Sequence, residues 1–102
     1  MSAKLKPVHP GEILRVEFME PLGLNPHKLS QALRVSAPAI YDIVNEKRGI
    51  STDMALRLAQ CFSTTPEFWL NMQTTYDLDV MRDKEADKIR REVLPVKAVA
   101  AD

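Results

Sequence analysis

The sequence predicts an all-α fold, a five-helix bundle followed by a C-terminal tail that is either a helix or a short strand. Apolar residues recur at helical spacing through most of the chain, and residues that cap helix N-termini precede these segments. No segment alternates apolar and polar residues long enough to indicate a sheet. With 102 residues, the chain is long enough for one domain with a single core.

His9 and Pro10 mark the start of the first predicted helix, because a proline suits the first helical turn. Ile13, Leu14 and Phe18 then place one face of this helix inward. We expect Gly23 to end the helix in the left-handed conformation, and His9 to contact the start of the helix rather than a metal ion.

Asn25 and Pro26 mark the start of the second helix, since Asn25 can accept a backbone hydrogen bond and Pro26 needs none. The predicted inward face consists of Leu29, Ala32 and Leu33. The helix is expected to break at Arg34.

The third helix is predicted to start near Ala37, with Ser36 as its cap. Its buried residues are expected to be Ile40, Ile43 and Val44, and it is expected to end between Asn45 and Arg48. Pro38 is compatible with this assignment because its missing N–H falls within the first turn.

Two further helices follow. Ser51-Thr52-Asp53 opens the fourth, and Thr64-Thr65-Pro66-Glu67 opens the fifth. The apolar positions predicted to pack are Ala55, Leu58, Ala59 and Phe62 in the fourth helix and Phe68, Trp69, Met72 and Tyr76 in the fifth. We expect Cys61 to be a small core residue, because apolar residues surround it and it has no cysteine partner.

After Asp79 the apolar pattern thins, Asp87 and Arg91 stand at i, i+4, and Pro95 stops any helix. This tail is predicted to be a solvated helix with a loose end or, alternatively, an interaction arm. The segment from Glu92 could instead pair as a short strand. The predicted organisation is an N-terminal arm over residues 1–8, a domain over 9–81 and a tail over 82–102.

The second and third predicted helices, joined by a turn of three to four residues, have the spacing of a helix-turn-helix. In this motif the second helix enters the major groove of DNA while the first braces it. Removing the expected buried residues leaves an outer face on the third helix. This face consists of Ala37, Pro38, Ala39, Tyr41, Asp42 and Asn45.

The outer face suggests separate roles in DNA binding. The small residues Ala37, Pro38 and Ala39 could touch a thymine methyl group, and Tyr41 can both pack and hydrogen-bond. Phosphates could be held by Asn45, Lys47 and Arg48 where the helix ends. Alternatively, the two helices simply pack a small bundle, since the face lacks the Arg or Gln that most often reads guanine or adenine.

The formal charges balance, with 14 Lys and Arg against 14 Asp and Glu, so the whole chain has no overall field that attracts a polyanion. By segment, residues 25–50 carry a net charge of about +2 and residues 51–80 about −3. The helix pair is therefore modestly basic and the following segment is acidic.

Other classes of function are not expected. The sequence shows no nucleophile and base arrangement, no His and Cys spacing for a metal, no cofactor motif and no apolar stretch long enough for a membrane span. We expect a cytoplasmic protein that is not an enzyme and that binds no cofactor.

Four stretches of the chain resemble one family. They are "HPGEIL", "LSQALRVSAPAIYDIVNEKRGIS", "TDMALRLAQCF" and "STTPEFWLNMQTTYDL". From His9 to about Met81 the chain is similar to the HigA-type antitoxins, also called the VapI or addiction-module antidote family, within the Cro and phage-repressor-like helix-turn-helix group. "ALRLA" followed by "TPEFWLNMQ" is the most specific part.

The resemblance implies a dimeric repressor that binds double-stranded operator DNA ahead of its own operon. It also implies binding to a co-encoded HigB-like toxin that cleaves mRNA. The family's groove-facing positions correspond to Ala37, Pro38 and Tyr41, and its phosphate-holding positions to Asn45, Lys47 and Arg48.

The chain departs from the family at Arg34, where such turns commonly carry a left-handed glycine. A non-glycine residue there costs on the order of 1 kcal/mol, and its guanidinium could gain a phosphate contact. Two alternatives remain open: a stand-alone helix-turn-helix regulator, and a toxin-binding protein without DNA binding.

Overall fold

The computed structural model describes residues 6–96, and within this range every regular element is helical. The elements are, in order, α1 (Pro10–Ile13), the π-helical stretch η1 (Leu14–Met19), α2 (Pro26–Leu33), α3 (Ala37–Val44), α4 (Thr52–Phe62) and α5 (Pro66–Glu92). The five predicted helices are confirmed, with α1 and η1 together forming the first. Residues 93–96 form no strand, and the rest of the candidate strand lies outside the described residues.

The predicted caps begin α2 to α5. In each case a side-chain oxygen accepts the backbone N–H three residues later, which satisfies one of the free donors at the helix start. The donor–acceptor distances are 2.7 Å at Asn25, 3.3 Å at Ser36, 3.1 Å at Ser51 and 3.1 Å at Thr65. These local bonds explain why each helix starts where the sequence predicts.

The first helix approaches the end of α3 closely. Its cap is the buried His9, whose Nδ1 accepts the Gly11 N–H at 2.9 Å. A Cβ atom on Gly11 would lie 1.9 Å from the carbonyl oxygen of Ile43, so only glycine permits this approach. Gly23 ends the turn after η1 with a φ of 66°, as predicted.

The core lies between the short helices and the first half of α5. Trp69 is fully buried, and its indole N–H donates to the hydroxyl of Thr64 at 2.8 Å. Around it, Leu14 of η1 and Leu58 of α4 are also fully buried. This core fixes the positions of α2 and α3.

Two predictions of burial are wrong. Ala32 is exposed and Ser30 is buried in its place, because Ser30 satisfies its hydroxyl locally by donating to the His27 carbonyl at 2.6 Å. Cys61 is exposed on α4. Partial burial nevertheless raises the pKa of the Cys61 thiol, so the thiolate form is disfavoured at neutral pH.

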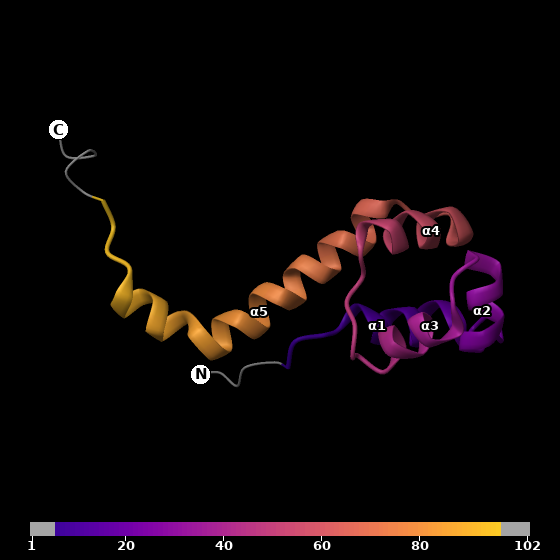
Figure 1. Cartoon of the computed structure of the whole chain (residues 1–102), viewed down its shortest axis with the longest axis horizontal. Coiled ribbons are helices and arrows are strands. Elements are labelled where there is room, and N and C mark those ends of the chain that lie inside the picture. The colour runs from indigo at the N-terminus through magenta and orange to yellow at the C-terminus, as the bar shows by residue number, and fades with distance from the viewer. Residues whose placement is uncertain (1–5, 97–102) are drawn as a thin grey trace.

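α5 extends far beyond the bundle, and Figure 1 shows it bending in its second half. The radius of gyration is 17.9 Å, against roughly 13 Å for a compact chain of this length. The predicted domain boundary at residue 81 falls inside this helix. In this part of the helix, Asp87 pairs with Arg90 at i, i+3.

Within residues 6–96, none of the helices combines the length and the apolar character that a membrane span needs.

Candidate nucleic-acid interface

A tight turn joins α2 to α3. Arg34 ends α2 in the left-handed conformation with a φ of 61°, as predicted for this non-glycine residue, and its side chain is exposed. The Val35 N–H returns to the Ser30 carbonyl at 3.0 Å, and Ser36 then caps α3. The turn is therefore closed by backbone bonds, which leaves the Arg34 guanidinium able to reach outward.

α3 has one buried face and one open face. Ile40 and Ile43 are fully buried, whereas Pro38 is exposed and Tyr41 retains 47% of its accessible surface. Ala37 is half-buried at the edge of this open face. Because only one face of α3 packs against the core, the open face presents side chains to solvent along the helix, as insertion into a major groove requires.

The prediction for Ala39 is wrong. Removing the expected buried residues had left it on the outer face, but it is buried with 8% exposure. The helical rotation of about 100° per residue sets it beside Ile40 and Ile43 and away from Tyr41. Ala39 therefore packs against the core, and its N–H donates to the Ser36 hydroxyl.

The end of α3 carries exposed polar and basic side chains, namely Asn45, Lys47 and Arg48. Arg48 lies 3.5 Å from the carboxylate of Asp42, so part of its charge is already paired. The loop after them is held to α5, where the Gln73 side-chain oxygen accepts the Ile50 N–H at 2.7 Å. This bond fixes the position of the basic end relative to the core.

The structure brings most of the predicted site residues together. Tyr41 and Asn45 share the open face of α3, and the two basic residues follow at its C-terminal end. Arg34 precedes the other end of this helix, whose eight residues span about 12 Å. The site thus consists of a small central face with a basic group at each end.

Sequence patterns did not reveal three contacts that shape this surface. Asp42 pairs with Arg48 across the helix end, Gln73 reaches the loop from α5, and the Arg57 guanidinium donates to the Leu33 carbonyl at 2.8 Å. The last two contacts join residues more than twenty positions apart, which no helical spacing indicates.

No metal site accompanies this surface: across residues 6–96, no group of three or more His, Cys, Asp or Glu side chains could hold a metal ion. An exposed helix, a bracing helix and a closed turn between them define a helix-turn-helix domain. The family model described as Helix-turn-helix matches residues 17–69, which include all of this surface.

Comparisons with known proteins give the family. The chain is 51% identical to virulence-associated protein I of Dichelobacter nodosus over 83 residues, covering 80% of this chain and 77% of that protein. It is 36% identical to antitoxin HigA-1 of Vibrio cholerae over 90 residues, covering 87% and 84%. The solved structure of the Pseudomonas aeruginosa antitoxin HigA with the higBA promoter superposes with a TM-score of 0.86 at 47% identity, covering 88% of this chain and 98% of that one. The chain belongs to the HigA-type antitoxin family of helix-turn-helix proteins.

Proposed function

We propose that this chain is the antitoxin of a type II toxin–antitoxin module. As a homodimer it represses its own operon by binding double-stranded operator DNA, and it also neutralises a HigB-like toxin that cleaves mRNA. We expect it to act in the cytoplasm, where operator and toxin are found, and to catalyse no reaction.

The observation that carries DNA binding is the open face of α3 with basic residues at both ends. Tyr41 and Pro38 occupy the centre of this face, where they can reach base edges and methyl groups. Lys47, Arg48 and Arg34 lie where they can contact phosphates on either side. The solved relative with its promoter supports this proposal, because at 47% identity the same fold binds DNA in that protein.

A homodimer follows from the size of this face. One helix of eight residues covers only a few base pairs, too few to select a site in a genome. Two copies related by a twofold axis would read two half-sites about 34 Å apart. The operator is then expected to be an inverted repeat.

A toxin-binding protein without DNA binding is the second candidate. The zero net charge and the pairing of Arg48 with Asp42 favour it, because both weaken attraction to phosphates. Both candidate functions include binding to the toxin, and they differ only in whether the chain also binds operator DNA.

A gel-shift experiment with the full chain separates them. The DNA immediately upstream of its gene should bind at lower protein concentration than random DNA of equal length. Equal affinity for the two DNAs, together with co-purification of a HigB-like toxin, would favour the second candidate.

A further inference from the structure

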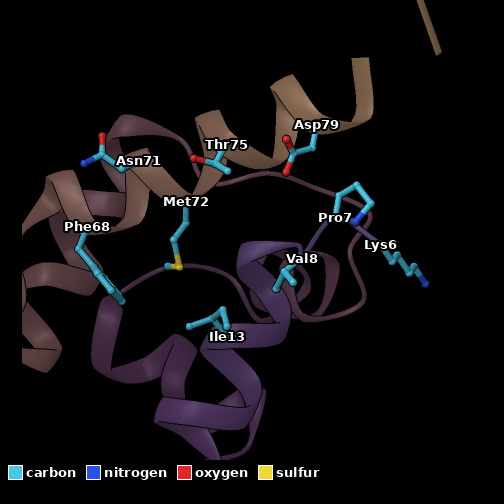
Figure 2. A pocket seen from close by; sticks show the side chains of 9 residues that line it. All are labelled: Lys6, Pro7, Val8, Ile13, Phe68, Asn71, Met72, Thr75 and Asp79. Carbon is cyan, nitrogen blue, oxygen red and sulfur yellow. The ribbon is translucent and has the colours of Figure 1, made fainter. Parts of the chain in front are cut away.

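Gln73 of α5 reaches the loop that joins α3 to α4. This loop, residues 45–51, carries the basic end of the open face. Figure 2 shows Met72 of α5 directed toward Ile13 of α1, and the next residue along α5 lies about 100° further around the helix. From there the Gln73 side-chain oxygen accepts the Ile50 N–H at 2.7 Å. The last helix thus holds a loop that lies 23 residues earlier in the chain.

The amide of Gln73 is fixed in one orientation. Its nitrogen donates to a carboxylate oxygen of Asp77, one turn further along α5, at 2.9 Å. An ionised carboxylate only accepts hydrogen bonds, and a backbone N–H only donates. A flipped amide would therefore lose both bonds, because its nitrogen would face the Ile50 N–H and its oxygen would face Asp77. Asp77 in this way keeps the acceptor of Gln73 directed at the loop.

The loop packs closely against this side chain. A Cβ atom on Gly49 would lie 2.8 Å from the Gln73 amide nitrogen and 2.9 Å from its oxygen, so the glycine backbone lies directly against the amide. Ile50, the next residue, is buried with 5% exposure. The bond from Gln73 is therefore the point at which the exposed loop returns to the core.

The other end of the loop is tied to α3. The N–H groups of Glu46 and Lys47 donate to carbonyl oxygens of α3 at 3.0 and 2.8 Å. Glu46 has a φ of 63°, a left-handed conformation that a non-glycine residue keeps only where its surroundings hold it. The backbone of Lys47 and Arg48 thus runs between two anchors, the bonds to α3 and the bond to Gln73.

We propose that Gln73 is a positioning residue for DNA binding. It holds the backbone of Lys47 and Arg48 in the place from which their side chains reach phosphates, without itself contacting DNA. A loop that is ordered before binding loses less conformational entropy when it binds. Without this anchor, DNA has to order the loop, and the phosphate contacts weaken. The inference rests on the DNA binding of the proposed function and adds to it a residue outside the open face of α3.

The variant Gln73→Met tests this role, because methionine is unbranched and makes no strong hydrogen bond. Binding to the DNA immediately upstream of the gene should weaken by about tenfold, the equivalent of one charge-assisted hydrogen bond. Binding to random DNA should weaken by the same factor, because phosphate contacts carry no sequence information. The log–log salt dependence should flatten toward that of Lys47→Ala. Fluorescence anisotropy with labelled duplexes measures all three, and wild-type values would overturn the proposal.

A double-mutant cycle separates positioning from other effects of Gln73. In a chain that already carries Lys47→Ala and Arg48→Ala, the further change Gln73→Met should alter DNA affinity by less than about twofold, because the contacts that it positions are gone. All affinities are compared at one low salt concentration, where weakened variants still bind. A decrease as large as in the wild-type background would overturn the proposal.

Thr64→Val is the matched control for stability. It removes the hydroxyl that accepts the Trp69 indole N–H at 2.8 Å, a bond of the core that involves no residue of the loop. Circular dichroism melting establishes that both variants are folded at the assay temperature. Thr64→Val should bind both DNAs like the wild type. If it weakens DNA binding as much as Gln73→Met does, loss of stability explains the effect and the proposal is wrong.

A charge-matched rescue tests the orientation of the side chain. Gln73→Glu keeps an acceptor for the Ile50 N–H but places a second carboxylate against Asp77, so DNA binding should weaken. Adding Asp77→Asn supplies a donor and restores the net charge, and binding should recover. Adding Glu67→Gln instead restores the charge alone, and binding should stay weak. Equal binding by the two double variants would overturn the proposal.

The outcomes also separate this inference from the function on which it rests. A wild-type chain that binds neither DNA contradicts the DNA binding itself. A wild-type chain that binds the upstream DNA, together with a Gln73→Met variant of equal affinity and equal salt dependence, contradicts only the role of Gln73.

Discussion

The guanidinium of Arg57 on α4 donates from Nη1 to the carbonyl oxygen of Leu33 at 2.8 Å, at the last residue of α2. The same side chain also pairs with Asp53 at 2.6 Å, one turn earlier on its own helix. The final carbonyl groups of a helix have no intrahelical donors, so Arg57 satisfies one of them. It thereby ties the turn before α3 to the core.

Arg57→Met should therefore destabilise the fold by about 1–3 kcal/mol, because it removes a charge-assisted hydrogen bond to a backbone carbonyl. The free energy of unfolding in urea measures this. Arg15→Met is the matched control, since Arg15 makes an exposed ion pair with Glu20 and should cost roughly 0–1 kcal/mol. Equal decreases in the free energy of unfolding for the two variants would show that the bond to Leu33 stabilises the fold no more than the exposed ion pair of Arg15 does.

His9 should make stability depend on pH. Burial lowers the pKa of His9 below its ordinary value of 6.5, and the charges of Glu46 and Asp77 offset only part of this effect. Between the lowered pKa and 6.5 the unfolded chain binds more protons at this residue than the folded chain. The free energy of unfolding should thus be highest above pH 6.5 and should decrease as the pH falls below it.

The variant His9→Asn keeps an acceptor for the Gly11 N–H but cannot titrate in this range. Its free energy of unfolding should vary less than that of the wild type between about pH 7 and pH 5.5. His27→Asn, at an exposed position, serves as the control and should keep the wild-type dependence. An unaltered pH profile in His9→Asn would argue against this role.

Lys47 and Arg48 are expected to act on phosphates and not on bases. Changing both to Ala should weaken binding to operator and random DNA alike. Removal of each phosphate contact should flatten the log–log salt dependence of binding by about one unit. Because Arg48 also pairs with Asp42, Lys47→Ala alone is expected to show the cleaner effect. If the salt dependence of binding had the same slope as in the wild type, neither residue would contact the DNA phosphates.

Tyr41 is expected to carry most of the sequence selectivity of α3, as the large side chain on its open face. Tyr41→Ala should weaken operator binding by on the order of 1–3 kcal/mol while leaving random-DNA binding nearly intact. Tyr41→Phe keeps the ring in place and removes only the hydroxyl's hydrogen bonds. Because Tyr41 is 47% exposed, neither change should lower the melting temperature strongly. A destabilised protein with an unchanged ratio of the two affinities would contradict the selectivity.

The helices and most of the residues on the open face of α3 can be predicted from the sequence alone. Caps such as Ser36 and Thr65 form bonds within three residues, and the repeat of Ile40 and Ile43 follows from helix geometry alone. These features are local, so they can be predicted from the sequence without knowledge of the tertiary structure. The left-handed conformation at Arg34, by contrast, was implied by the family resemblance and not by the local sequence.

The way in which these local pieces meet depends on the tertiary structure. The contact from Gln73 to Ile50 and the bond from Arg57 to Leu33 both depend on the direction in which one helix faces another. A single residue's rotation of about 100° is enough to move a side chain from solvent to core, and side chains joined across helices leave no periodic signal. An apolar groove of about 620 Å³ beside α5 arises in the same way, because Val8 and Phe68 line it together only when the residues before α1 fold against the last helix.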